Sequence, residues 1–258
     1  MFYPEPLKPQ ESDPRYWGFP QATELRLETS DRVNLHAWWF PASVAGTPAG
    51  GSCGVAIYLH GNAGHLGDRG TVAAGLAGIG LDVLLPDYRG YGLSEGKPSE
   101  AGLYLDAEAA YRYATETLGV SPGRVLVVGN SLGAAVAADL ASRFPVGGLV
   151  LLGAFTNTPS VARTALPWLP DWLLDWEGTR FDTARRVQSV SAPVFVAAGS
   201  EDDVISPDEG RAVYEAANQP KSFFEATGSG HNDIFSHPVL WQKLVLFTRQ
   251  ALRCDESA

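Results

Sequence analysis

The stretch Val125-Leu126-Val127-Val128-Gly129-Asn130-Ser131-Leu132-Gly133-Ala134-Ala135-Val136-Ala137 decides the fold. The four apolar residues before Gly129 are typical of a strand that is buried on both faces, as in a parallel sheet. An Ala-rich pattern begins just after Ser131 and predicts a helix with an apolar face, which can lie close against that sheet. Ser131 is therefore expected at a sharp corner between a strand and a helix.

Glycines flank this serine at positions 129 and 133. A side chain at either position would collide with its neighbours in so sharp a turn, and Ser131 itself is expected to have a strained backbone. The amides at the start of the helix point into the same space, with the positive end of the helix dipole behind them. The pattern is that of a nucleophile elbow, with Ser131 as nucleophile and the Leu132 amide as an oxyanion donor.

Strand-like and helix-like segments alternate along the rest of the chain. Segments 24–29 and 33–40 predict a hairpin at the edge of a sheet. Further strands are predicted at 55–60, 81–85, 148–152, 194–198 and 222–226, and further helices at 68–77, 99–118, 207–217 and 238–253. This order predicts a doubly wound, mostly parallel α/β sheet in a single domain over residues 1–258. Ser206 and Glu209 predict a capping box at the start of the helix 207–217.

A serine nucleophile needs a base, and the base needs a carboxylate to fix its tautomer. His231 lies in a Gly-rich loop after the last predicted strand and is the candidate base. Glu201, Asp202 and Asp203 follow the strand 194–198, and their spacing alone does not separate them as candidate acids. The order Ser, Asp, His along the chain is the one used by hydrolases with a nucleophile elbow.

The loop after the strand 55–60 supplies the second oxyanion donor. It begins His60-Gly61-Asn62, and the Asn62 amide is the natural donor beside that of Leu132. His60 is expected to brace the loop rather than to act in catalysis.

Residues 154–190 interrupt the alternation and are predicted to form a small helical cap insertion. Trp168, Trp172 and Trp176 are four residues apart and would line one face of a helix. Trp172 and Trp176 either present an apolar wall to an acyl group or pack against the body of the protein. His65 is a further candidate for the substrate pocket.

The composition is that of a globular protein with a sizeable core: 258 residues, 45% of them hydrophobic. A formal net charge of −10 argues against nucleic acid and anionic membrane surfaces as partners. Two cysteines, Cys53 and Cys254, are too few for a disulfide framework, so reduced thiols are expected. No signal peptide and no membrane-spanning stretch is recognised, and a cytoplasmic location is expected.

Five motifs in order carry a family resemblance: residues 60–64, 87–96, 129–133, 199–202 and 230–233. With them the chain resembles the serine α/β-hydrolases of the Bem46-like and ABHD17-like type, over roughly residues 22 to 250. The resemblance implies the α/β-hydrolase fold and assigns Asp202 as the acid. Family members are esterases, thioesterases and protein depalmitoylases; the cysteine cluster that anchors the depalmitoylases to membranes is absent from this N-terminus.

The sequence therefore predicts a serine hydrolase that cleaves a small or lipid-like acyl ester or thioester, with the triad Ser131, His231 and Asp202 and with no cofactor or metal. An amide or peptide hydrolase with the same triad is the second interpretation. A binding protein that retains the fold without turnover is the third.

Overall fold

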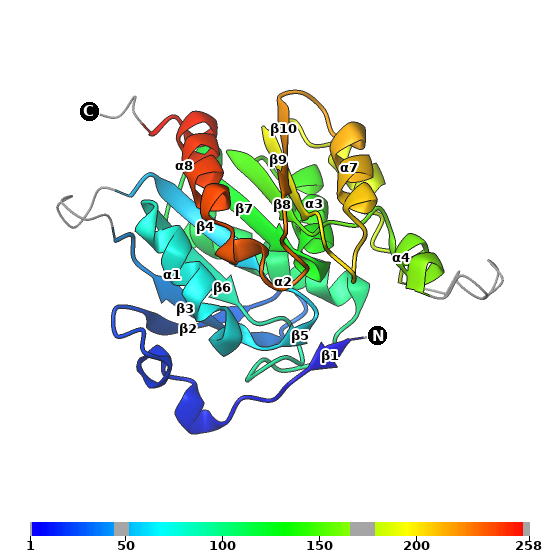
Figure 1. Ribbon diagram of the computed structural model, residues 1–258. Helices are drawn as coiled ribbons and strands as arrows, with labels where there is room; N and C mark the ends of the chain where they lie inside the picture. The colour runs from blue at the N-terminus through cyan, green and yellow to red at the C-terminus, as the bar shows by residue number, and fades with distance from the viewer. Residues whose placement is uncertain (1, 44–51, 166–178, 255–258) are drawn as a thin grey trace.

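The computed structural model describes residues 2–43, 52–165 and 179–254 (Figure 1). Its centre is an eight-stranded sheet in the order β10-β9-β8-β7-β4-β6-β3-β2. The strands are β2 (Thr23–Glu28), β3 (Asn34–Phe40), β4 (Gly54–Leu59), β6 (Leu81–Pro86), β7 (Val125–Asn130), β8 (Gly148–Leu152), β9 (Val194–Gly199) and β10 (Lys221–Ala226). Strand β3 runs antiparallel to both of its neighbours, and the other strand pairs are parallel. The predicted edge hairpin and parallel sheet are confirmed.

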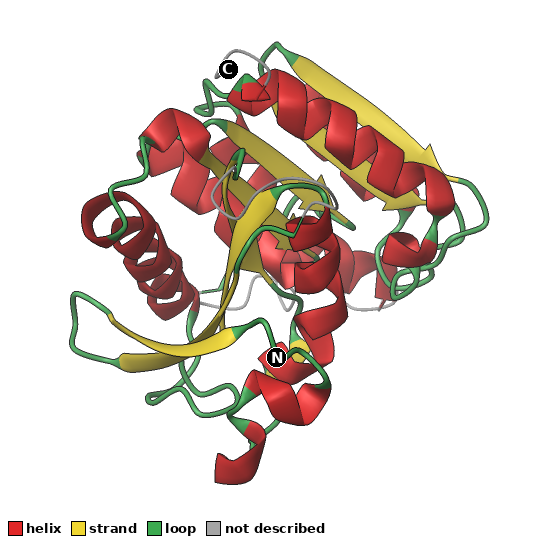
Figure 2. Ribbon diagram, turned by 90° about the vertical axis from the view of Figure 1, so that its left-hand side faces the viewer, coloured by secondary structure: helices red, strands yellow, loops and turns green. Residues whose placement is uncertain are grey.

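Helices cover both faces of this sheet (Figure 2). One face carries α1 (Gly70–Gly78) and α8 (Pro238–Leu252), and the other carries α2 (Glu100–Arg112), α3 (Leu132–Arg143), α6 (Thr183–Val187) and α7 (Pro207–Ala216). Because successive strand residues point to opposite faces, β4 sends Ile57 into the core under α2 and α3 and sends Tyr58 into the core under α1 and α8. The predicted helix over 99–118 ends its α-helical part at Arg112 and continues as a π turn to Thr117.

Of the predicted cap insertion at 154–190, the structure describes α4 (Thr158–Ala165), α6 and the loops beside them. Trp172 and Trp176 lie outside the described residues. The predicted capping box of α7 is wrong. Ser206 does cap the helix, but the Glu209 carboxylate accepts hydrogen bonds from the Thr156 amide (2.7 Å) and hydroxyl (2.6 Å) instead of from the helix start. Glu209 thereby ties α7 to the segment that leads into α4.

The N-terminal arm folds onto the loop that follows β4. The short strands β1 (Tyr3–Pro4) and β5 (Ala63–Gly64) pair in parallel, and the Tyr3 amide donates to the Asn62 Oδ1 at 3.3 Å. Two 3₁₀ helices follow in the arm, at Pro9–Glu11 and Pro14–Trp17. The backbone amides of Tyr3 and Glu5 thus tie the arm to the loop 60–66.

The expectation of two reduced cysteines is contradicted. Cys53, just before β4, and Cys254, just after α8, form a disulfide with their Cα atoms 5.2 Å apart. This pairing could not be predicted from the sequence, because 201 residues separate the two positions. Among the described helices, none is long and apolar enough to cross a membrane.

Candidate active site

Ser131 lies between β7 and α3 with a backbone φ of 55°, a conformation that residues other than glycine rarely adopt. A Cβ at position 129 would overlap the backbone of Gly133 and Ala134, and one at position 133 would overlap the carbonyls of Leu59 and His60. The steric reason for the two glycines is thus confirmed. The strain is held in place because the Ser131 amide donates to the Leu152 carbonyl of β8 at 2.8 Å.

The three residues that were expected to act together do lie together. Nε2 of His231 is 3.1 Å from the Ser131 Oγ, and Nδ1 of His231 is 2.8 Å from the Asp202 Oδ2. They come from the carboxyl ends of β7, β9 and β10, which meet at one edge of the sheet. The turn after β9 and the histidine loop pass closely enough that a Cβ at Gly199 would overlap the backbone of Ser229 and Gly230.

Of the three candidate acids, only Asp202 contacts His231. The Asp202 side chain is buried, whereas Glu201 and Asp203 are exposed. Its second oxygen, Oδ1, accepts from the amides of Val204 at 3.0 Å and Ile205 at 2.8 Å. These two bonds aim Oδ2 at His231, so only Asp202 has a fixed orientation toward the imidazole.

The two predicted oxyanion donors border the same space. Leu132 begins α3, and the loop with Asn62 passes so close that a Cβ at Gly61 would lie 3.5 Å from that of Ser131. The Tyr91 hydroxyl lies 2.9 Å from both the carbonyl oxygen and the Oδ1 of Asn62. Asn62 is therefore held by its side chain, which the sequence did not indicate.

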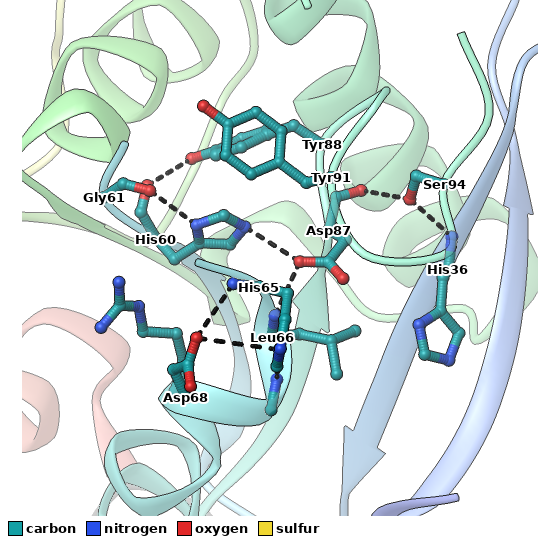
Figure 3. A network of polar contacts seen from close by, with 12 residues as sticks. His36, His60, Gly61, His65, Leu66, Asp68, Asp87, Tyr88, Tyr91 and Ser94 are labelled. Atoms are coloured by element: carbon teal, nitrogen blue, oxygen red, sulfur yellow. Dashed lines mark hydrogen bonds and ion pairs between the residues drawn. The ribbon is translucent and has the colours of Figure 1, made fainter. Parts of the chain in front are cut away.

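A buried polar network stabilises this loop (Figure 3). His60 is inaccessible to solvent; its Nδ1 lies 2.7 Å from the Gly61 carbonyl oxygen and its Nε2 lies 3.2 Å from the Asp87 Oδ1. The Tyr88 hydroxyl donates to the His60 carbonyl at 2.9 Å, and the Leu66 amide donates to the same Asp87 oxygen at 2.7 Å. The bracing role expected for His60 is confirmed. The partners from the segment 87–96 were visible only as a family motif.

His65 does not lie in the pocket where it was expected. Its Nδ1 accepts from the Gly67 amide at 3.2 Å, and its ring packs edge-on against Trp17 with the centroids 5.4 Å apart. The side chain thus caps a 3₁₀ turn, Leu66–Arg69, under the N-terminal arm and is 7% exposed. The sequence around His65 is as polar as that around His60, so sequence alone does not tell which histidine of the loop would line the pocket.

A pocket of about 960 Å³ opens beside Ser131 and His231. One wall lies between α1 and α8, and the other is formed by α4 and by the loop that leads from β9 to α7. Both walls are largely apolar: Val72, Phe235 and Trp241 belong to the first, and Phe155, Val161, Val204 and Ile205 to the second. In the described part of the chain no group of three or more His, Cys, Asp or Glu side chains could hold a metal ion.

The described site can be compared with known proteins. The family model of the α/β-hydrolase fold matches residues 55–192. An uncharacterized protein of Mycobacterium tuberculosis (strain H37Rv) is 40% identical over 216 residues, which covers 83% of this chain and 74% of that protein. Human alpha/beta hydrolase domain-containing protein 17B is 32% identical over 197 residues, covering 76% of this chain and 66% of its own length.

Solved structures agree with the fold. The esterase Pf2001 of Pyrococcus furiosus superposes with a TM-score of 0.73 over 97% of this chain and 98% of its own, at 23% identity. An esterase domain from Rhodothermus marinus gives 0.66 over 89% and 99%, at 20% identity. These two likenesses are ones of fold alone. The family match over residues 55–192 shows that this chain belongs to the α/β-hydrolase family. Within that family it falls in the branch of the human protein 17B and its relatives.

Proposed function

We propose that this chain is a serine hydrolase that cleaves a carboxylic ester or thioester through an acyl-enzyme. The observation that carries the proposal is the continuous contact from Asp202 through His231 to the Ser131 hydroxyl, at the mouth of an apolar pocket. A nucleophile, a base and an orienting carboxylate at hydrogen-bond distances are what acyl transfer at neutral pH requires.

The steps follow from these contacts. Ser131 Oγ attacks the acyl carbon while His231 Nε2 accepts its proton, and the negative charge on the acyl oxygen faces the amides of Leu132 and Asn62. The proton then passes to the leaving alcohol or thiol, whose bond to the acyl carbon breaks. A water molecule attacks the acyl-enzyme with His231 again as base, which releases the carboxylic acid and restores the serine. Asp202 accepts a hydrogen bond from His231 Nδ1 and stabilises the imidazolium.

The walls of the pocket favour an acyl substrate of small or lipid-like character. Burying one methylene against such walls contributes roughly 0.8 kcal/mol to the binding free energy, so we expect the apolar side chains to set the preferred acyl-chain length. Hydrolysis of an amide or peptide bond would use the same triad, but the amine is a much poorer leaving group than an alcohol or thiol. No feature of the described pocket favours an amide substrate.

The experiment is labelling with a fluorophosphonate probe, followed by assays with matched acyl esters, thioesters and amides. We expect labelling at Ser131, its loss in Ser131→Ala, and turnover of esters or thioesters. Turnover confined to amides would favour the peptidase interpretation. An unlabelled, folded wild-type protein would indicate a binding protein and overturn the proposal.

A further inference from the structure

The wall of the pocket between α1 and α8 contains two polar side chains that the proposed reaction does not use. Arg69 lies immediately before α1, and Tyr58 lies near the carboxyl end of β4. Both line the same pocket as Ser131 and His231. The other side chains of this wall include the apolar Val72, Phe235 and Trp241 and the polar Thr71 and Ser236, and Arg69 is the one lysine or arginine among the described residues that line the pocket.

The Arg69 guanidinium is incompletely bonded. Its Nη2 donates to the Ala63 carbonyl at 2.7 Å, whereas its Nε is buried and has no hydrogen-bond partner among the described residues. A buried donor without an acceptor is costly, particularly when it is charged. By contrast, the guanidinium of Arg89 is held by the carboxylates of both Asp31 and Asp106. This acidic chain neutralises Arg89 with two carboxylates but places no carboxylate within ion-pair distance of Arg69 in its described part.

Tyr58 supplies a second donor in the same pocket. Its side chain is 1% exposed, its ring packs edge-on against Phe235, and its hydroxyl has no hydrogen-bond partner in the described part of the chain. Burial raises the pKa of Tyr58 far above its ordinary value, while the charge of Arg69 acts in the opposite direction. The hydroxyl is therefore a neutral donor at physiological pH.

One acidic residue, Asp68, lines the same pocket but faces elsewhere. Its Oδ2 accepts from the His65 amide at 3.1 Å and lies 3.8 Å from the His65 Nδ1. The positive charge of Arg69 is thus not cancelled by it. The N-terminal end of α1, at Gly70, adds partial positive charge on the same side.

We propose that Arg69 and Tyr58 form an anion subsite of the substrate pocket, which selects esters or thioesters that carry a carboxylate or phosphate group. The inference rests on the proposed function, because the anion is held by the same pocket in which Ser131 attacks. The apolar side chains of Val72, Phe235 and Trp241 around the subsite fit an aliphatic spacer between the anionic group and the scissile bond. The substrate class is therefore an amphiphilic acyl ester with one charged end.

The test compares kcat/KM for matched anionic and neutral substrates. One arm pairs the mono-4-nitrophenyl ester of glutaric acid with 4-nitrophenyl hexanoate, and the other pairs 1-butyrylglycerol 3-phosphate with 1-butyrylglycerol. We expect wild type to prefer the anionic member of at least one pair, and the favoured arm tells carboxylate from phosphate. Arg69→Gln should reduce this preference roughly 10- to 100-fold, and Tyr58→Phe should reduce it less.

Arg249→Gln is the matched control, because it removes the same charge from an exposed position near the end of α8. It should leave the preference unchanged. Arg69→Lys retains a charged donor toward Ala63 and should keep part of the preference, which separates charge recognition from support of the loop. The subsite would be overturned if wild type showed no preference for the anionic substrates and if wild type and Arg69→Gln hydrolysed the neutral esters equally well. That result would leave the proposed hydrolase activity intact.

A binding measurement keeps the inference testable without turnover. Calorimetric titration of the Ser131→Ala variant with hexanoate, hexyl phosphate and hexanol should show tighter binding of at least one anion than of hexanol. Combining Ser131→Ala with Arg69→Gln should abolish that difference. Equal affinities for all three compounds would contradict the subsite, whereas an unlabelled wild-type serine in the probe experiment would contradict the hydrolase.

Discussion

Nε2 of His60 lies 3.2 Å from Oδ1 of Asp87, and solvent reaches neither side chain. The same carboxylate oxygen accepts from the Leu66 amide, so one residue at the end of β6 contacts both ends of the loop 60–66. Asn62 lies within that loop. The loop that carries Asn62, the proposed second oxyanion donor, is therefore anchored by a carboxylate that does not itself line the pocket.

We expect Asp87→Ala to lower kcat with little change in KM, because the oxyanion loop would lose its anchor while the pocket walls remain. Leaving the Leu66 amide without an acceptor should also lower the free energy of unfolding by roughly 1–3 kcal/mol. The measurement is steady-state kinetics on one activated ester together with urea unfolding.

Asp82→Ala is the control for this change, since Asp82 lies on the same strand and its carboxylate also accepts from a backbone amide, that of Ala42 at 2.8 Å. It should cost stability without affecting kcat. If both variants lowered kcat to the same extent, the loss would reflect β6 as a whole and not the loop.

Ser131→Ala should abolish hydrolysis, because loss of the nucleophile in such a triad typically costs on the order of 10⁶ in kcat. The fold should persist, since the side chain borders a pocket and its removal leaves no core cavity. The φ of 55° adds a second expectation: Ser131→Gly should be more stable than Ser131→Ala by about 1 kcal/mol or more, because glycine adopts this backbone without strain. Equal stability of the two variants would show that the elbow stores no strain.

Asp202→Asn should lower kcat by about 10⁴, as an amide beside Nδ1 favours the wrong imidazole tautomer. Asp203→Asn and Glu201→Gln are the matched controls, because both residues are exposed and neither contacts His231. Each should stay within roughly tenfold of the parent, about 1.4 kcal/mol. All three variants should be assayed across pH, with folding checked by circular dichroism. A severe defect in Asp203→Asn alone would show that Asp203, and not Asp202, is the acid.

Much of the fold follows from local sequence because buried parallel strands are continuous apolar runs and amphipathic helices are periodic. The elbow was also predictable, since steric conflict at positions 129 and 133 depends only on residues close in sequence and on the neighbouring strand. The choice of Asp202 over its neighbours came from the family resemblance alone and not from the residues themselves. It depends on which carboxylate the amides of residues 204 and 205 can orient, and spacing carries no record of that.

Long-range partners account for the remaining gaps. His65 and His60 belong to one loop, yet one caps a turn under Trp17 and the other contacts Asp87. Glu209 satisfied the spacing of a capping box but found hydroxyl and amide donors in Thr156, which lies 53 residues earlier. Such contacts are decided by tertiary packing, which outweighs local preference.

The stability of the protein should fall on acidification through a single buried histidine. His36 is inaccessible to solvent, and both of its ring nitrogens lack hydrogen-bond partners among the described residues. Burial lowers the pKa of His36. The charges of Asp87 and Glu24 oppose this shift, and that of Arg26 adds to it. Above the unfolded pKa of about 6.5 both states are neutral at this position. Below it the unfolded chain takes up a proton that the folded protein resists, so stability decreases by up to about 1.4 kcal/mol per pH unit.

His36→Leu removes this proton uptake and should flatten the dependence of unfolding free energy on pH between about 6.5 and the lowered folded pKa. Urea unfolding of both proteins at several pH values in that window measures the difference in slope. Identical slopes would mean that His36 titrates equally in the folded and unfolded states, and its burial would then have no electrostatic cost.

The disulfide joins Cys53, just before β4, to Cys254, just after α8, across a sequence separation of 201 residues, with the two Cα atoms 5.2 Å apart. Cross-linking so long a loop restricts the unfolded chain, which typically stabilises a protein by roughly 2 to 5 kcal/mol. Cys254→Ser should therefore lower the Tm and remove its sensitivity to reductant. Any hydrolytic activity at room temperature should be retained, because the bond lies at the opposite end of α8 from the His231 loop. Thiol titration of the unfolded wild-type protein should detect no free cysteine before reduction and two afterwards. A wild-type Tm that does not change with reductant would contradict a stabilising disulfide. Because such bonds persist in oxidising compartments, two free thiols in protein isolated from its native cells would instead favour the cytoplasmic location expected from the sequence.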